Sequence, residues 1–314
     1  MNPEQRADVR RVRHVADIIG ITVILELAIN LAILVLLRFI PDAQNALLEQ
    51  LGEIVSYVVI FFVPFALMTH WNGWTLRELN GDGRPGPLVF LMAICLAAGW
   101  NFIATMLSVG VEEIIALFGY TEPAAPYVQT NGMAELLLQI LEIALIPPVV
   151  EELCFRGFYL KLAQRAMGIW PAIVLSSVLF WLAHNSISIL PLAFGFGILG
   201  GVLRVTYRSL LPSMCAHFVV NGSYILVNWV QSTQPPMWQH TLSLLFVFVE
   251  LLCLIAGILL AHRLGLFAAA RAYARDSWLV ERRDLLRGLL TSVPFWVILL
   301  SAAYFIHRGL EVLG

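Results

Sequence analysis

Residues 17–38 read DIIGITVILELAINLAILVLLR, a run in which only Asp17, Glu26 and Arg38 are ionisable. A helix needs about 20 predominantly apolar residues to cross the hydrocarbon core of a bilayer. The run therefore predicts a membrane span. The basic stretch from Arg6 to Arg13 precedes it, and no small-residue cleavage site follows. We expect a first transmembrane helix here and not a cleaved signal peptide.

The composition of the whole chain agrees with this first span. The 314 residues are 60% hydrophobic and 13% charged, and the mean hydropathy is +0.82. Soluble globular domains carry about 25% charged residues, so a soluble protein is excluded. The net charge of −2 gives no reason to expect a nucleic-acid partner. The four cysteines lie in apolar runs without metal-binding spacing, which argues against a disulfide framework.

Nine apolar runs are long enough to cross a bilayer as helices. They lie at 17–38, 53–71, 87–110, 134–155, 168–186, 190–207, 210–230, 241–262 and 288–307. No soluble domain fits between them, so residues 1–314 are expected to form a single integral membrane domain. The predicted fold class is all-α, a polytopic transmembrane helix bundle.

The basic residues orient the predicted spans. If the N-terminus is cytoplasmic, 17 of the 19 Lys and Arg residues fall on the inner side, and only Arg38 and Arg308 lie outside. This distribution follows the positive-inside rule. An eight-span alternative, with the 185–191 connection re-entrant, places the later arginines on the wrong side. The single Lys against eighteen Arg indicates a GC-rich genome and favours a bacterial inner membrane.

Segment 263–287 differs from the other connections. It mixes arginines with Leu264, Phe267, Trp278, Leu279 and Leu285 just before the last predicted span. Such a pattern is typical of an amphipathic helix lying on the headgroups of the inner face. An ordinary basic loop is the alternative interpretation.

Ionisable residues inside apolar spans are functional-site hypotheses by default. The first cluster is Glu151-Glu152-Leu153-Cys154-Phe155-Arg156, which follows Pro147-Pro148. Glu152 and Arg156 are four residues apart with the acid first, the better order for a helical ion pair. Glu151 points about 100° away and has no partner at helical spacing. Because it is unpaired, it is the candidate general base.

Two further motifs follow on separate apolar runs. Phe180 precedes His184 by four residues, and His217 precedes Asn221 by four, so each pair lies on one helical face. Helical rise places Glu151 and His184 at similar depths, and His217 and Asn221 can reach them. Together these groups predict a polar chamber able to activate water and stabilise an oxyanion.

These three ordered motifs resemble those of the CPBP family. It contains the CAAX-processing Ras-converting enzyme and the bacteriocin-processing intramembrane proteases. The resemblance covers about 134–230, which we take as the catalytic core, and no motif position departs from the pattern. It implies an intramembrane endopeptidase whose substrate is a membrane-associated protein or peptide.

The resemblance also implies roles for single residues. Glu151 with His184 would activate the hydrolytic water, and His217 with Asn221 would hold the oxyanion. Glu152 and Arg156 would order the site. Whatever role the motif gives it, we expect Phe180 to be cavity wall or core. Members have been described both as metalloproteases and as metal-independent glutamate proteases. Glu151, His184 and His217 are the candidate ligands if zinc is bound, although no HExxH-type pair is present, and we expect no obligatory metal.

Two other functions remain open from the sequence. A non-catalytic relative, such as an immunity or scaffold protein, would keep the motifs as a structural polar network. A proton-coupled transporter would instead use the other acidic residues in the spans. These are Glu26 in the first span, Glu142 in the fourth and Glu250 in the eighth.

Overall fold

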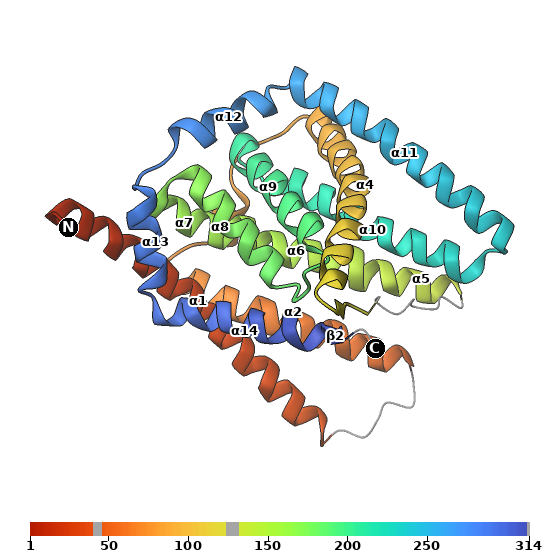
Figure 1. Ribbon diagram of the computed structural model, residues 1–314, viewed down its shortest axis with the longest axis horizontal. Coiled ribbons are helices and arrows are strands. Elements are labelled where there is room, and N and C mark those ends of the chain that lie inside the picture. The colour runs from red at the N-terminus through yellow and green to blue at the C-terminus, as the bar shows by residue number, and fades with distance from the viewer. Residues whose placement is uncertain (40–45, 124–131, 313–314) are drawn as a thin grey trace.

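The computed structural model describes residues 1–39, 46–123 and 132–312. Figure 1 shows a bundle of helices of different lengths and directions. In chain order the elements are α1 (Pro3–Leu37), α2 (Ala46–Trp71), α3 (Leu76–Asn80), α4 (Pro87–Leu117), β1 (Tyr120–Thr121), α5 (Met133–Gln139), η1 (Ile140–Leu145), α6 (Ile146–Glu151), η2 (Glu152–Tyr159), α7 (Leu160–Met167), α8 (Ile169–Leu182), α9 (Leu190–Tyr207), α10 (Leu211–Thr233), α11 (Pro236–Arg263), α12 (Leu266–Asp276), α13 (Arg282–Leu290), α14 (Val293–Gly309) and β2 (Glu311–Val312). The predicted all-α membrane bundle is confirmed.

Five helices of the described residues are long and apolar enough to cross a membrane. They are α1, the 50–71 part of α2, α4, α9 and α11, and α13 with α14 makes a sixth if this pair, bent by 81°, is one span. Helix α8 has only 14 residues. Each of the nine predicted spans coincides with helical structure, but the number nine stays a prediction.

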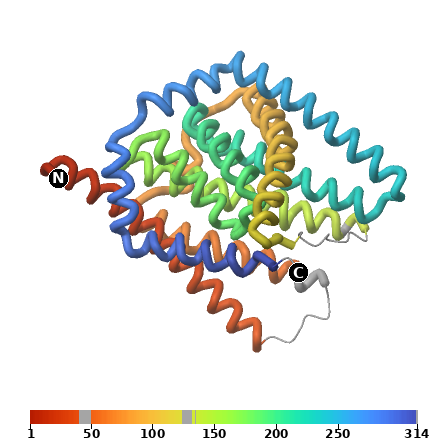
Figure 2. Tube along the Cα trace, in the orientation of Figure 1, coloured from red at the N-terminus to blue at the C-terminus, as the bar shows by residue number. Residues whose placement is uncertain are grey.

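The helices around the polar motifs occupy the middle of the bundle. Figure 2 shows α8, α9 and α10 enclosed by α1 and α2 on one side and by α4 and α11 on the other. Helix α9 approaches α8 closely because of its glycines. A Cβ on Gly197 would lie 2.7 Å from the Cβ of Ser177, and one on Gly201 would lie 2.9 Å from Ile173. Small residues at these positions allow the two backbones to touch.

The segment that carries the first motif is not a regular α-helix. Two π-helical stretches, η1 and η2, flank the short α6, which begins with Pro147 and Pro148 in its first turn. Proline lacks the N–H that an α-helical hydrogen bond requires. The carbonyl of Phe155, inside η2, accepts hydrogen bonds from the Leu160 N–H and from Ser176 Oγ at 2.7 Å. The hydroxyl of Ser176, on α8, thus stabilises the wider π-helical turn of η2.

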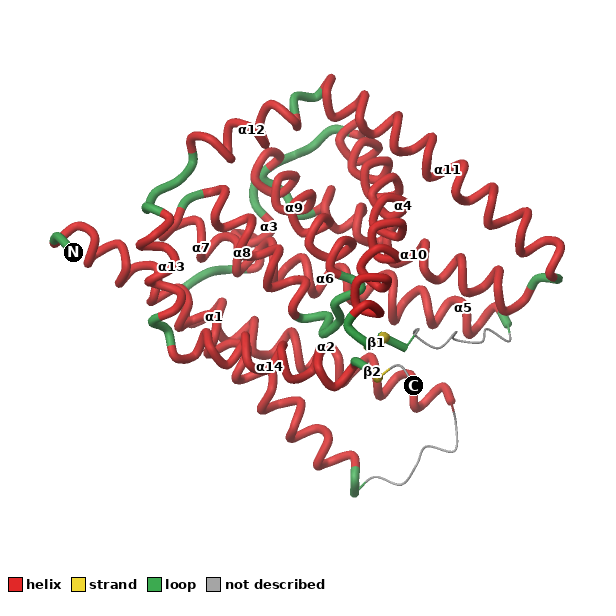
Figure 3. The backbone as a smooth tube through the Cα atoms, viewed as in Figure 1, coloured by secondary structure: helices red, strands yellow, loops and turns green. Residues whose placement is uncertain are grey.

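The C-terminal region wraps around the outside of this core. Figure 3 shows α12 and α13 as separate helices joined by a loop. The segment predicted as one amphipathic helix, 263–287, therefore contains α12 and the first part of α13. Its position on an inner membrane face stays a prediction. Gly168 has a φ of +94° and forms a β-bridge with Trp278, in the loop between α12 and α13. A Cβ on Gly168 would lie 1.9 Å from the carbonyl oxygen of Ser277.

A small sheet and a carboxylate tie the chain end and a loop together. Strand β1 pairs antiparallel with β2, with Tyr120 opposite Val312. Just after β1, Glu122 accepts hydrogen bonds from Ser186 Oγ at 2.8 Å and from the N–H groups of Ile187 and Ser188 at 2.8 and 2.9 Å. This carboxylate holds the loop that follows His184, together with hydrogen bonds from Trp181 Nε1 to the Ser186 carbonyl and from Ser108 Oγ to the Ser188 carbonyl.

Candidate active site

Glu152 lies at the centre of the buried polar network. Its side chain is fully buried, and Arg156 Nη1 lies 2.8 Å from Oε1, so the ion pair predicted from the i, i+4 spacing is present. His217 Nδ1 is 3.2 Å from Oε1, and Ser213 Oγ donates a hydrogen bond to Oε2. These donors compensate the cost of burying the carboxylate.

Arg156 is held by aromatic rings as well as by Glu152. Its guanidinium carbon lies 4.1 Å from the centroid of the Phe180 ring and 5.3 Å from that of Phe196. A cation over an aromatic face is attracted by the ring quadrupole, more strongly when both are desolvated. Gly200 leaves the space for this group, since a Cβ there would lie 3.2 Å from Arg156 Nε. Phe180, predicted as a cavity wall, is thus also a platform for the guanidinium.

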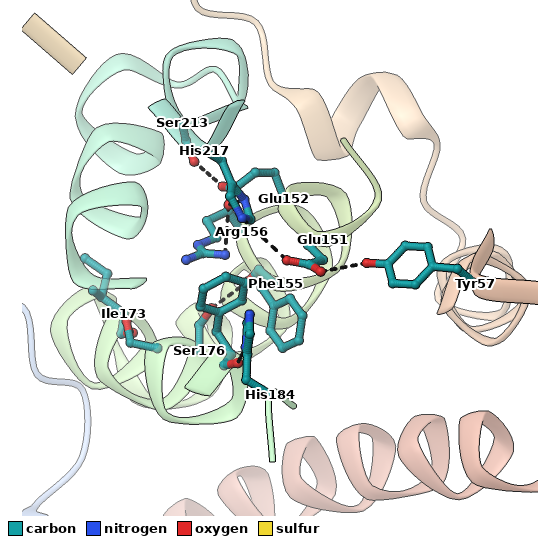
Figure 4. Close-up of polar contacts among 12 residues, drawn as sticks. Tyr57, Glu151, Glu152, Phe155, Arg156, Ile173, Ser176, His184, Ser213 and His217 are labelled. Atoms are coloured by element: carbon teal, nitrogen blue, oxygen red, sulfur yellow. Dashed lines mark hydrogen bonds and ion pairs between the residues drawn. The ribbon is translucent and has the colours of Figure 1, made fainter. Parts of the chain in front are cut away.

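Glu151 is held on one side and open on the other. Tyr57, on α2, donates a hydrogen bond of 2.6 Å to its Oε1 (Figure 4). Its Oε2 is buried and has no hydrogen-bond partner in the described part of the chain. This oxygen lies 3.6 Å from His217 Nε2, too far for a hydrogen bond. A buried, unsatisfied carboxylate oxygen is costly, and such exceptions call for an explanation, of which catalysis is one.

His217 lies between the two adjacent carboxylates. Because an ionised carboxylate only accepts hydrogen bonds, the contact to Glu152 places a hydrogen on Nδ1. Nε2 then faces Glu151. The ring packs against Phe196 and Phe180, with centroid distances of 4.7 and 5.5 Å. Both nitrogens are therefore directed at carboxylates while the ring faces are shielded.

His184 lies at the edge of this group. The run 168–186 was expected to be helical, but α8 ends at Leu182, because Asn185 turns the backbone with a φ of +53°. The Phe180 carbonyl accepts a hydrogen bond of 2.7 Å from His184 Nδ1, which leaves the lone pair on Nε2. The imidazole contacts the Phe180 ring edge-on at 4.8 Å. It is exposed, unlike His217.

Asn221 lies one helical turn beyond His217 on α10. Its Nδ2 donates a hydrogen bond of 2.8 Å to the carbonyl oxygen of Ile143, in η1. A primary amide has two N–H donors, so one remains for another acceptor. The predicted residues Glu151, Glu152, Arg156, Phe180 and His217 form one connected group, in which His217 lies next to both carboxylates and Phe180 contacts Arg156 and His217. His184 joins them through Phe180, and Asn221 anchors to η1.

Two residues of the network were not among the predicted site residues. Ser213 precedes His217 by one helical turn, a spacing that places it on the same face. Tyr57 lies 94 residues before its partner and outside all three motifs. No pattern in the sequence links it to Glu151.

A metal site was tested against the same geometry. Among the residues that the structure describes, no group of three His, Cys, Asp or Glu side chains is arranged to hold a metal ion. The zinc set considered from the sequence, Glu151, His184 and His217, does not form such a group. We therefore assign no step to a metal.

The comparisons with known proteins address the segment that holds these contacts. Residues 133–223 match the family model described as type II CAAX prenyl endopeptidase Rce1-like. This segment is similar to that family. The match contains all three motifs and supports a hydrolase of the protease class in a membrane. No curated protein and no solved structure matches the chain. Tyr57 lies outside the Rce1-like segment.

Proposed function

We propose that the protein is an intramembrane endopeptidase that hydrolyses a peptide bond of a membrane-associated protein or peptide. The observation that carries the proposal is the unsatisfied, buried Oε2 of Glu151, which faces His217 Nε2 within an Rce1-like segment. A water hydrogen-bonded to this oxygen would be deprotonated by Glu151 as it attacks the scissile carbonyl.

The other motif residues complete the reaction. His184, with its Nε2 lone pair, would assist Glu151 in accepting and returning the proton to the leaving amine. His217 and the second N–H of Asn221 would donate to the oxyanion of the tetrahedral intermediate. To donate from Nε2 while Nδ1 donates to Glu152, His217 needs a hydrogen on each ring nitrogen. The carboxylates of Glu151 and Glu152 would balance the positive charge of this imidazolium. Glu152, Arg156 and Phe180 fix the ring and form no covalent intermediate.

The finer topology belongs to the same proposal. We propose nine spans with a cytoplasmic N-terminus in a bacterial inner membrane, supported by the distribution of basic residues. The motifs then meet near the middle of the bilayer. A substrate held in the membrane would reach the site laterally, with its scissile bond shielded from lipid by the bundle.

The protease proposal is tested by Glu151→Gln in cells that express the full chain. We expect peptides released from membrane proteins, identified by mass spectrometry, to disappear in this variant. Glu250→Gln is the matched control, because Glu250 is also buried in a helix and accepts a hydrogen bond from Asn101 at 2.7 Å. Equal peptide release in wild type and Glu151→Gln, at equal protein levels, would contradict the proposal.

The same pair of variants separates the alternatives. A non-catalytic scaffold would show no released peptides in either variant or in wild type. A transporter would lose solute flux in Glu250→Gln and keep it in Glu151→Gln.

A further inference from the structure

A basic cavity lies beneath the candidate active site, between α7 and α9. Its volume is about 240 Å³, and its lining includes Arg156, Lys161, Gln164, Arg204 and Arg208. Residues 156, 160 and 164 follow one another at four-residue spacing from η2 into α7, as 204 and 208 do on α9. The cavity therefore runs between two helix faces, from the buried guanidinium of Arg156 toward the helix ends.

The cations of this cavity differ in how they are compensated: Arg156 pairs with Glu152 and Arg208 with Asp82. In the described part of the chain, neither Lys161 nor Arg204 has a carboxylate within ion-pair distance. Arg204 donates to the Leu79 carbonyl at 2.8 Å through Nη2, but its Nε is buried without a partner. Arg156 also has a buried Nε and Nη2 without hydrogen-bond partners, and its side chain is fully buried. Unsatisfied, buried guanidinium N–H groups that line a polar cavity indicate an anionic ligand.

The turn between α3 and α4 packs against one end of this cavity. A second cavity of about 370 Å³ shares Lys161, Arg204 and Arg208 and adds Arg77, Glu78 and Asp82. The Gly81–Gly83 turn closes on the end of α9, where Gly83 N–H donates to the Arg208 carbonyl at 2.9 Å. A Cβ on Gly81 would lie 2.1 Å from that same oxygen. Asp82 pairs with Arg208 at 2.5 Å, whereas Lys161 and Arg204 line the cavity without an ion-pair partner among the described residues.

The surroundings of Lys161 disfavour its charged form. Burial lowers the pKa of its ammonium group; Glu78 opposes this, while Arg165 and Arg204 add to the lowering. An anion beside the ammonium group would act against this lowering. Because the ammonium also lies 4.7 Å from the Trp74 ring centroid, its position at the cavity is fixed by packing.

We propose that this cavity binds a phosphate group, either the headgroup of an anionic phospholipid or free phosphate. Guanidinium and ammonium groups are the usual partners of phosphate. The position agrees with either source, since the basic-residue pattern assigns these residues to inner connections or, for Arg204, to the inner end of the 190–207 span. The site does not depend on the proposed protease activity, although Arg156 belongs to both.

The test uses the purified full chain and two probes. Binding of phosphatidylglycerol, compared with phosphatidylcholine, is measured by native mass spectrometry, and inorganic phosphate is titrated while the melting temperature is recorded. We expect Lys161→Gln to weaken phosphate-group binding about fivefold, from about 1 kcal/mol per cation near an anionic headgroup. Arg271→Gln is the control, since Arg271 is exposed on α12, on the same predicted face.

The outcomes separate the sources and can overturn the proposal. Binding of phosphatidylglycerol with no response to inorganic phosphate assigns a lipid headgroup, and a melting-temperature rise with inorganic phosphate assigns a soluble one. Lys161→Glu, which reverses the charge, should abolish either response while the ligand-free melting temperature stays unchanged. The proposal is wrong if wild type binds neither probe, if Lys161→Gln binds as wild type does, or if Arg271→Gln loses as much.

Discussion

At the scale of single residues, the site is decided by which carboxylate has its hydrogen bonds filled. Glu152 receives hydrogen bonds from Ser213 and His217 and pairs with Arg156, whereas Glu151 receives one from Tyr57 and keeps one oxygen unsatisfied. Adjacent residues of one type thus have different environments. The satisfied carboxylate is suited to hold the site, and the unsatisfied one is suited to react.

Tyr57→Phe tests whether the hydrogen bond to Glu151 positions the base. We expect kcat to fall about tenfold with KM unchanged, because a hydrogen bond to a charged group contributes about 1.5 kcal/mol. Tyr224→Phe is the control, since Tyr224 is exposed on α10. Steady-state kinetics on a peptide identified by the proteomic comparison would measure both constants. An unchanged kcat would show that Tyr57 does not position Glu151.

The residue-scale predictions from sequence succeeded where the partners are close along the chain. The Glu152–Arg156 pair followed from its spacing and is present at 2.8 Å. Tyr57 could not be found this way, since the contact depends on how α2 packs against α6. The roles of Glu151, His184, His217 and Asn221 in catalysis stay predictions.

At the scale of elements, the close contact between α8 and α9 depends on glycines, and a hydropathy pattern does not predict such a contact. Each predicted span coincides with a helix or a chain of helices, but the π-helical stretches and the end of α8 at Leu182 were not predicted. Hydropathy indicates how long an apolar run is. It does not indicate whether each backbone N–H bonds to the carbonyl four or five residues earlier. The wider turns depend on partners from other helices, such as Ser176.

Gly197→Ala tests the contact between α8 and α9. A Cβ at this position would lie 2.7 Å from Ser177, and overpacking of this kind costs about 1–3 kcal/mol. We expect a lower melting temperature in detergent. Gly222→Ala is the matched control on α10, where a Cβ would meet nothing within 4 Å and the better helix propensity of alanine should leave stability unchanged or raised. Equal effects of both changes would contradict the packing argument.

Glu122→Gln tests how β1 holds the loop after His184. Burial raises the pKa of Glu122, but hydrogen bonds from Ser186, Ile187 and Ser188 outweigh it, so the pKa is lowered overall. A lowered carboxyl pKa stabilises the fold above the ordinary glutamate value of about 4.3, and the stabilisation is lost as the pH falls through the folded value. The melting temperatures of wild type and Glu122→Gln should differ at pH 7 and converge as the pH falls through the lowered pKa of the folded state. A difference independent of pH would exclude this role.

At the scale of the whole molecule, a bundle with charges at its ends and a polar centre fits an integral membrane protein. The five or six candidate spans of the structure and the nine predicted ones differ because short or polar helices, such as α8 and α10, fail a length or hydropathy criterion. Inside a bundle such helices can be covered by their neighbours. The number of membrane spans therefore depends on how the helices pack in the bundle, and the hydropathy of each helix alone does not determine it.

Cysteine labelling in intact cells tests the proposed nine spans. With the native cysteines replaced, Ser232→Cys should react with an impermeant maleimide from outside, and Arg275→Cys should react only after the membrane is opened. Nine spans place residues 84 and 275 on the same side of the membrane, whereas the eight-span alternative places them on opposite sides. Labelling of Arg275→Cys in intact cells would thus exclude nine spans with a cytoplasmic N-terminus.

The π-helical stretches have a consequence for how this gene can vary. A π-turn bonds residue i to i+5 and so holds one residue more than an α-turn. Loss of a single codon within η2 would therefore allow a regular α-helix while the residues on either side keep their orientation. At 153–155 such a loss would also shorten the spacing of Glu152 and Arg156 from four residues to three, whereas at 157–159 it would leave every motif residue and its spacing in place. In-frame deletions at 153–155 should thus be eliminated by selection, and single deletions at 157–159 should be tolerated.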